Sequence, residues 1–398
     1  MDNDATVAAV PEPSRSEERP AHETSAGETS AGETSAGETS AGETSAGETP
    51  AGETSAGETP REGPRALDVV GMGNAIVDVL AEVPDRVLAE LGLVRGSMEL
   101  ADLRRAEEIY SALGPAVEVS GGSAANTVAG VAALGGTAGF VGKVADDDLG
   151  NVFVHDMRAS GVDLRVAVAD ADVGDAEERG TGRSLVLVTG DAERTMATHL
   201  GVAGILGPED VPGDLVARCR VLYLEGYLWD RPSAKEAMRL AVEIAHDHDR
   251  SVALSLSDSF CVERHRQDLL DLVLGDVDVL FGNEHELVRL FEVHTLEDAL
   301  SAAAETGALV AATCGARGSF VVDGRGPVEV PAAHAPQIVD KTGAGDMYAS
   351  GFLFGLSRGL EPADCARLGS KCASAVLGHL GARPKHDLAQ LARAEGLR

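Results

Sequence analysis

The segment Asp340-Lys341-Thr342-Gly343-Ala344-Gly345-Asp346 has the residue types of an anion site at the start of a helix. The apolar pattern after it predicts a helix over Ala344–Ser357. Small residues at this N-terminus leave backbone N–H groups accessible, with the positive end of the helix dipole behind them. Such a site suits a phosphate group. Asp346, in the first turn, either complements the dipole or takes a proton from a hydroxyl group that attacks a phosphoryl group.

Three further segments carry residue types that bind sugars, phosphates or hard cations. In residues 120–126, glycines let the backbone approach a sugar closely and Asn126 offers a donor and an acceptor, but an ordinary helix N-terminus has the same pattern. Asn283 and Glu286 offer the oxygen ligands that suit Mg²⁺, and they equally suit the cap and first turn of a helix. Residues 313–318 form a loop with two glycines between two expected strands.

The elements that must position these residues begin near Ala66. Short apolar runs predict strands, and they alternate with patterns of helical spacing. Strands are expected at residues 67–71, 76–83, 138–141, 184–188, 220–224, 252–257, 277–281, 308–313 and 319–323. Helices are expected at residues 102–113, 124–134, 151–159, 232–248, 284–291, 344–357 and 362–379. This alternation predicts an α/β fold with a mostly parallel sheet covered on both faces, whose ligands bind at the carboxyl ends of the strands.

Composition excludes several classes of partner. The chain has 398 residues, with 33 Lys and Arg against 65 Asp and Glu, for a net charge of −32. Nucleic acid and anionic membranes need clustered Lys and Arg, so we expect neither as a partner. The five scattered cysteines indicate neither a disulfide framework nor a zinc site. The N-terminus lacks the apolar region of a secretory signal, and no stretch approaches the ~20 apolar residues of a membrane span. We therefore expect a cytoplasmic protein.

The first 62 residues differ from the rest. From Glu23 the unit E-T-S-A-G starts eight times, with Pro50 and Pro60 in place of Ser in two units. No side chain in the unit is larger than Thr, so ordering would bury too little apolar surface to offset its entropy. The sequence predicts a disordered acidic tail over residues 1–62 and a folded domain over residues 63–398.

The 340–346 segment resembles the C-terminal signature D-T-x-G-A-G-D of the ribokinase-like, PfkB-type carbohydrate and nucleoside kinases, with Lys341 where Thr is common. Other segments match in the family's order. Val70-Gly71-Met72-Gly73-Asn74-Ala75-Ile76-Val77-Asp78 resembles the opening strand and turn, particularly of adenosine kinases. Residues 120–126 resemble the N-terminal signature, residues 283–286 the N-x-x-E motif, and residues 313–318 the T-x-G-x-x-G loop. The resemblance covers about residues 66–385.

The resemblance implies a kinase that uses ATP and Mg²⁺ and has a small β lid beside the main sheet, made from segments near residues 75–83, 94–100, 116–120 and 163–198. It implies that Asp346 is the catalytic base and that Asp78 binds a ribose diol. The backbone at Gly343, Ala344 and Gly345, with Arg194, would stabilise the transferred phosphoryl group. The remaining implied contacts are Asn74, Gly121, Gly122, Ser123 and Asn126 for the substrate, Thr313, Gly315 and Gly318 for ATP, and Asn283 and Glu286 for ATP and, through water, for Mg²⁺.

Several alternatives stay open from the sequence. Adenosine, phosphorylated to AMP as in purine salvage, is the favoured acceptor; a free sugar or a sugar phosphate is the rival within the family. A non-catalytic nucleotide-binding regulator is a second alternative. A dinucleotide-dependent oxidoreductase is a third, because Gly71-x-Gly73 follows a strand, but position 76 is Ile and a further strand is expected there. A phosphate-binding P-loop at Gly142-Lys143 is excluded, because position 137 is Thr and Val144 replaces Ser or Thr.

Overall fold

The structure is a computed structural model. It describes residues 66–394 apart from positions 171, 172, 174, 176, 177, 192 and 386, together with residue 396. The predicted acidic tail, residues 1–62, lies outside the described residues. Within the described part of the chain, no helix is both long and apolar enough to cross a bilayer.

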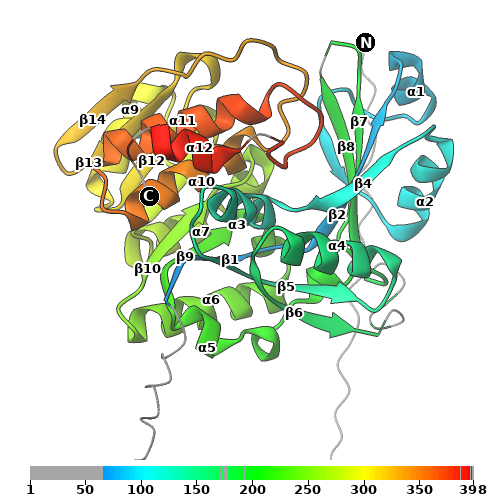
Figure 1. Ribbon diagram of the computed structural model, residues 1–398, viewed down its shortest axis with the longest axis horizontal. Coiled ribbons are helices and arrows are strands. Elements are labelled where there is room, and N and C mark those ends of the chain that lie inside the picture. Colours follow the sequence, from blue (N-terminus) through cyan, green and yellow to red (C-terminus); the bar gives the residue numbers. More distant parts are fainter. Residues whose placement is uncertain are drawn as a thin grey trace, which may run out of the picture. The chain divides into compact units, whose positions relative to one another are not determined.

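A large sheet of nine strands forms the centre of the described domain (Figure 1). Seven neighbouring strands are parallel, and the last two strands at one edge form an antiparallel hairpin. The order across the sheet is β14 (Gly326–Val330), β13 (Ser319–Asp323), β12 (Leu309–Thr313), β11 (Val279–Asn283), β10 (Ser251–Ser255), β9 (Cys219–Glu225), β1 (Leu67–Met72), β5 (Ala138–Ala145) and β6 (Asp163–Ala169). The predicted α/β class with a mostly parallel sheet is confirmed.

Helices cover both faces of this sheet, and each face has its own apolar core. Because successive side chains of a strand point to opposite faces, Leu222 packs into one core and Val221 into the other. The first core is closed by α5 (Gly213–Val216), α6 (Pro232–Asp247), α7 (Ser259–Gly275), α8 (Glu284–Leu290) and α9 (Leu296–Glu305). The second is closed by α3 (Ser123–Ala133), α4 (Asp148–Ala159), α10 (Ala344–Ser357), α11 (Pro362–Val376) and α12 (Leu388–Ala394).

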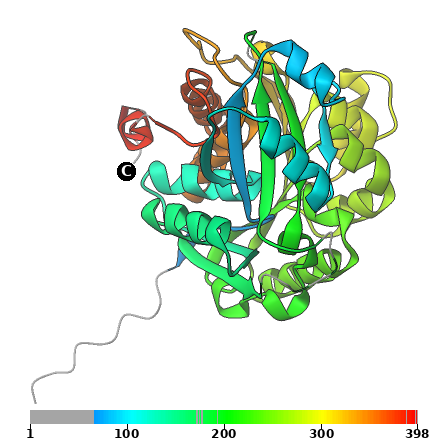
Figure 2. The same cartoon turned by 90° about the vertical axis from the view of Figure 1, so that its right-hand side faces the viewer.

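A second sheet of five strands stands beside the large one (Figure 2). Its order is β3 (Met98–Leu100), β8 (Arg194–His199), β7 (Gly182–Val188), β2 (Ile76–Glu82) and β4 (Val117–Gly121). Two helices, α1 (Asp85–Glu90) and α2 (Leu103–Ala112), pack on its outer face against side chains such as Val79 and Leu185. The opposite face carries Asp78 and Ser184 and lines a cavity.

One segment assigned to the small sheet belongs elsewhere. Residues 163–169, predicted as part of the lid segment 163–198, form β6 and pair in parallel with β5 at the edge of the large sheet. The strand follows α4 in a β-α-β unit, which places it beside β5. Its alternation of apolar and charged residues suits the edge of either sheet, so the pattern alone could not decide between them.

Five helices of the described residues have no counterpart among the predicted elements: α1, α5, α7, α9 and α12. The two longest are α7 and α9. In α7 the helical pattern is interrupted at His265, whose backbone (φ −123°, ψ 20°) is not helical, so the apolar spacing shifts register within the helix. In α9 the residues facing the core include the small Ala299 and Ala303, which contrast weakly with the polar face. Capping residues mark both starts, since Asp258 accepts from Cys261 N–H and Thr295 accepts from Asp298 N–H.

Candidate active site

A cavity of about 580 Å³ lies between the two sheets, at the carboxyl ends of the parallel strands. Its wall includes residues at or just after the ends of β1, β9, β10, β11 and β12, as expected for a sheet of this kind. Most of the predicted site residues meet there: Asn74, Asp78, Gly122, Ser123, Asn126, Arg194, Asn283, Glu286, Thr313, Gly315, Gly343, Ala344, Gly345 and Asp346 line the cavity. Gly121 and Gly318 do not.

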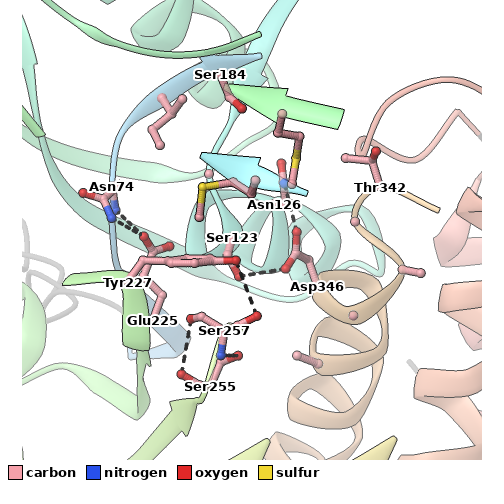
Figure 3. Close-up of a pocket in the computed structure, with 18 of the residues that line it drawn as sticks. Asn74, Ser123, Asn126, Ser184, Glu225, Tyr227, Ser255, Ser257, Thr342 and Asp346 are labelled. Atoms are coloured by element: carbon pink, nitrogen blue, oxygen red, sulfur yellow. Dashed lines mark hydrogen bonds between the residues drawn. The ribbon is translucent and has the colours of Figure 1, made fainter. Parts of the chain in front are cut away.

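Asp346 receives two hydrogen bonds from the start of α3 (Figure 3). Ser123 Oγ donates to one carboxylate oxygen at 2.8 Å, and Asn126 Nδ2 donates to the other at 3.0 Å. Burial raises the pKa of Asp346, while the bonds from Asn126 and Ser123 and the charges of Arg194 and Arg383 oppose that rise. The N-termini of α3 and α10 therefore converge on one carboxylate that faces the cavity.

The turn before α10 is fixed by Asp340. This fully buried carboxylate accepts from the N–H and the hydroxyl of Thr342, at 2.8 and 2.6 Å. Gly343 caps the helix with a φ of 75°, a conformation that favours glycine. Within the described residues the N–H groups of Gly343, Gly345 and Asp346 have no backbone acceptor outside the helix, whereas Ala344 N–H donates to Lys341 O at 3.3 Å. Three N–H groups, those of Gly343, Gly345 and Asp346, therefore have no main-chain acceptor there, whereas that of Ala344, predicted to contact the transferred phosphoryl group, already donates to Lys341.

Asp78 is a buried carboxyl group without a hydrogen-bond donor among the described residues. It lies on β2, is 7% exposed and faces the cavity. Burial raises its pKa to about 7; the charge of Arg383 acts against this rise and that of Asp346 adds to it. A buried carboxylate normally has hydrogen-bond partners, so a ligand with hydroxyl groups in the cavity would satisfy it.

Gly121 packs directly against the carboxyl group of Asp78. A Cβ atom added to Gly121 would lie 2.3 Å from the carboxyl carbon of Asp78, closer than any real contact. We therefore expect Gly121→Ala to displace this carboxyl group and raise the KM for the acceptor by about tenfold, the equivalent of one hydrogen bond, with the KM for ATP unchanged. The measurement is steady-state kinetics of the folded variant. The matched control is Gly190→Ala, in the turn between β7 and β8 of the same sheet, where an added Cβ has nothing within 4 Å. Equal kinetics for the two variants would contradict the expectation.

Asn283 and Glu286 form a capping box at the start of α8. The Asn283 side chain accepts from the N–H groups of His285 and Glu286, and the Glu286 carboxylate accepts from Asn283 N–H at 2.9 Å. Burial raises the pKa of Glu286 to about 7. Both residues also line the cavity, so the cap and the predicted site coincide. No group of three or more His, Cys, Asp or Glu side chains suited to a metal ion occurs among the described residues.

The end of β12 and the loop that follows it contribute Thr313 and Gly315 to the cavity. Gly318, predicted as an ATP contact, instead shapes the hairpin. Its φ is 96°, and an added Cβ would lie 2.1 Å from the carbonyl oxygen of Val330. Only glycine fits there, so its place in the motif has a structural reason.

Two cations from different segments line the cavity. The side chain of Arg194, at the start of β8, donates no hydrogen bond to any described residue, and its charge acts on Asp78 and Asp346. Lys341, in the turn before α10, lies 4.0 Å from Glu193. Both cations can therefore turn toward an anion in the cavity.

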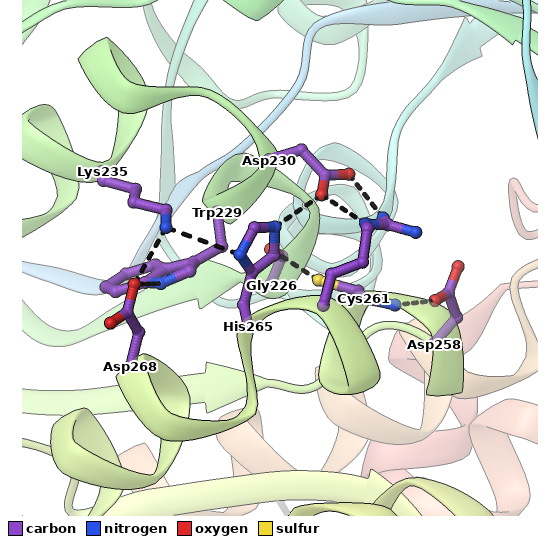
Figure 4. Close-up of polar contacts among 9 residues, drawn as sticks. Gly226, Trp229, Asp230, Lys235, Asp258, Cys261, His265 and Asp268 are labelled. Atoms are coloured by element: carbon purple, nitrogen blue, oxygen red, sulfur yellow. Dashed lines mark hydrogen bonds and ion pairs between the residues drawn. The ribbon is translucent and has the colours of Figure 1, made fainter. Parts of the chain in front are cut away.

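A polar network behind the cavity holds η3 (Gly226–Asp230) against the kinked α7 (Figure 4). Asp230, which also lines the cavity, accepts two bonds from Arg264, at 3.0 and 2.8 Å. The kink brings His265 Nε2 within 2.8 Å of the same carboxylate. This network fixes the cavity wall that carries Tyr227.

The comparisons with known proteins agree with this geometry. The model of the pfkB family carbohydrate kinases matches residues 93–388. The chain belongs to the PfkB family. This confirms the predicted family, and it makes the protein a kinase that phosphorylates an alcohol group, in a family that uses ATP.

Relatives of this PfkB kinase carry different names. A 5-dehydro-2-deoxygluconokinase from Bacillus subtilis is 27% identical over 330 residues, which is 79% of this chain and 90% of that protein. A solved structure of a "probable sugar kinase" from Rhizobium etli is 43% identical, with a TM-score of 0.80 over 84% of this chain and 100% of the other. An adenosine kinase from Sinorhizobium meliloti is 48% identical, with a TM-score of 0.78 over 83% and 99%.

The PfkB assignment removes the dinucleotide alternative. After β1 the chain continues through Asn74 directly into strand β2, not into the helix that a dinucleotide site requires. The side chain of Asn74, predicted as a substrate contact, is engaged with Glu225.

Sequence reasoning missed Glu225 as a site residue. It is 1% exposed and lines the cavity at the end of β9. Its carboxylate accepts from Asn74 N–H, Asn74 Nδ2 and Ala124 N–H, each at 2.8 Å, and burial raises its pKa to about 7. Glu225 thus ties the turn after β1 to the start of α3. The signal available in the sequence was an acidic residue at the end of an apolar strand.

Proposed function

We propose that this PfkB kinase transfers the γ-phosphoryl group of ATP to the primary hydroxyl group of a ribose-containing small molecule, with adenosine as the favoured acceptor and AMP as the product, a step of purine salvage. One observation carries the proposal: two carboxylates with different surroundings face the same cavity. Asp78 lacks a hydrogen-bond donor among the described residues, as a binder of a vicinal diol would, and Asp346 lies at an anion site, as a base for phosphoryl transfer would.

The proposed reaction balances as an in-line displacement. Asp346 takes the proton of the acceptor hydroxyl group as its oxygen bonds to the γ-phosphorus, and the bond from that phosphorus to the β,γ-bridging oxygen breaks to release ADP. The N–H groups of Gly343 and Gly345, with Arg194, stabilise the charge on the phosphoryl oxygens. Closure of the small sheet over the cavity would exclude water, which otherwise competes with the acceptor.

We infer that Mg²⁺ accompanies ATP and neutralises charge on its phosphates. Asn283 and Glu286 would bind this ion through water and not directly. Their side-chain oxygen atoms already accept hydrogen bonds within the capping box of α8. Both residues line the cavity, where they would contact the water shell of the ion.

A nucleoside is favoured over a free sugar by the apolar side chains on the cavity face of the small sheet and next to it. A base needs such a surface, whereas a sugar does not. These side chains are Ile76, Met98, Leu100, Met196 and Leu200. The 48% identity to the adenosine kinase from Sinorhizobium meliloti also supports a nucleoside. The second candidate, a sugar-type acceptor, is favoured by the names of the 5-dehydro-2-deoxygluconokinase and "probable sugar kinase" relatives.

The test is ADP release from Mg·ATP with adenosine, other nucleosides, ribose, fructose and 5-dehydro-2-deoxygluconate as separate acceptors. We expect turnover with adenosine and none with the sugars. Turnover with a sugar alone would remove the nucleoside proposal and keep the mechanism. ATP binding without turnover of any acceptor would favour a regulator.

We place this activity in residues 63–398, since the family model lies within them, and we assign no catalytic role to residues 1–62. The cytoplasm is the proposed location, because all five cysteines are free, buried thiols, as in proteins of reducing compartments.

A further inference from the structure

A short segment after α11, residues 381–383, contacts both halves of the site. Gly381 N–H donates to Asp340 at 2.8 Å, on the turn before α10. Ala382 packs directly on Gly343, where an added Cβ would lie 2.4 Å from the Cβ of Ala382. The next side chain, Arg383, reaches the start of α3. Three consecutive residues therefore join the anion site to the acceptor side of the cavity.

The Arg383 guanidinium is held by the turn from β4 into α3. Its Nε donates to Ser120 O at 3.0 Å, its Nη2 to Ser120 Oγ at 3.1 Å, and its Nη1 to Ala125 O at 2.9 Å. Ser120 and Ala125 bracket Ser123, which donates to Asp346. Five N–H donors in a rigid plane suit such a multiple contact, and lysine could not reproduce it.

The positive charge of Arg383 acts on both functional carboxylates. Burial raises the pKa values of Asp78 and Asp346, and Arg383 and Arg194 oppose both rises. Burial also lowers the pKa of Arg383 to about 10, which leaves it charged at neutral pH. Asp156, which accepts from Ser120 N–H at 3.0 Å, is the other acidic group beside this guanidinium.

The two arginines differ in their freedom to move. The side chain of Arg194 donates no hydrogen bond to a described residue and can turn to a phosphate, whereas the donors of Arg383 are held by Ser120, Ala125 and Met157. We propose that Arg383 is a positioning residue and the permanent counter-charge of the acceptor site: its bonds hold the turn that carries the contacts of Asp78 and Asp346, and its charge stays in place while the transferred phosphate engages Arg194. The inference rests on the roles proposed above for the two aspartates and holds for a nucleoside or a sugar acceptor.

Other titratable groups also interact electrostatically with Asp78 or Asp346. They come from four parts of the chain. They are Asp340 in the turn before α10, Arg194 of β8, Tyr223 and Glu225 of β9, and Tyr227 of η3. Of these described groups, Arg194 alone is a cation, and Lys341 in the turn before α10 also faces the cavity. Once a phosphate engages these two side chains, Arg383 is the cation that remains for both aspartates.

The test compares the pH dependence of kcat/KM for the wild type, Arg383→Gln and Arg383→Lys, with whichever acceptor is turned over. Loss of the charge in Arg383→Gln should move the acidic limb of the profile upward by about one pH unit. At a pH below the limb, kcat/KM would then be about tenfold lower. Arg383→Lys keeps the charge but loses the multiple contact, so its limb should stay in place while the KM for the acceptor rises.

Arg250→Gln is the matched control, because Arg250 also binds a main-chain carbonyl group, that of Ala217 at 2.9 Å, away from the cavity. Its limb should coincide with that of the wild type. An unmoved limb in Arg383→Gln would overturn the proposal, as would a limb moved equally in Arg383→Lys. If Arg383→Gln does not fold, the test rests on Arg383→Lys. An acidic limb that moves in this variant would then overturn the proposal. Turnover of sugars alone would remove the adenosine assignment without affecting this comparison.

Discussion

Replacing Asp346 with asparagine should lower kcat by about 10²- to 10⁴-fold, the usual contribution of a general base. The amide cannot take the proton of the acceptor hydroxyl group. It can still occupy the place of the carboxylate beside Ser123 and Asn126, so the start of α10 should keep its geometry. We therefore expect ATP affinity to change little, because the interaction that is lost forms in the transition state. Steady-state kinetics and calorimetric titration with Mg·ATP measure the two quantities.

Asp364→Asn is the matched control for this variant. Asp364 lies in the first turn of the neighbouring helix α11, and its salt bridge to Arg367 is exposed to solvent. If an aspartate in the first turn acted only through the helix dipole, both variants would lose stability slightly and neither would lose turnover. An Asp346→Asn enzyme with nearly normal kcat would exclude the role of base.

The order of elements was largely predictable from the sequence, because apolar periodicity reports burial directly. The runs near Val70, Leu222 and Val310 alternate with helical patterns, and all three form strands of the large sheet. Periodicity fails where side chains are small, as at Ala299 in α9, or where a helix bends, as at His265 in α7. It also cannot assign β6 to one of two sheets, since that choice depends on tertiary contacts.

The candidate site was predictable where residue types recur in a motif, and not where the contacts join distant segments. Asp346 stands within a recognisable signature. Its donors Ser123 and Asn126 come from a second signature, more than two hundred residues away, and no spacing predicts their contact. Glu225 and Arg383 lie outside the signature motifs of the family. Their roles follow from bonds to main-chain groups, which any residue type offers.

The surroundings of Asp78 imply that function and stability conflict at this position. Its pKa of about 7 in the folded protein lies above the ordinary value of 3.8. Between these two values the folded state binds more protons than the unfolded state, so stability falls as the pH rises through this window. Above pH 7 the ionised carboxylate destabilises the fold by at most ~4 kcal/mol, since a tenfold change in a proton-binding constant corresponds to about 1.4 kcal/mol.

We therefore expect Asp78→Asn to make the ligand-free protein more stable at pH 8, with a higher Tm, and to lose this advantage near pH 4. The same variant should raise the KM for the acceptor by about 100-fold, because hydrogen bonds to a charged acceptor are lost. It should leave the KM for ATP almost unchanged. Thermal unfolding at the two pH values and steady-state kinetics test these expectations together.

Asp68→Asn should behave in the opposite way. Asp68 is equally buried, yet its bonds from Arg358 and Thr137 outweigh the effect of burial and lower its pKa. Its replacement should destabilise the protein at pH 8 and leave the acceptor KM unaffected. The two variants therefore distinguish a buried carboxylate with a structural role, Asp68, from one that binds the acceptor, Asp78. An Asp78→Asn protein less stable than the wild type at pH 8 would assign Asp78 to the structural class and leave the acceptor diol without its proposed partner.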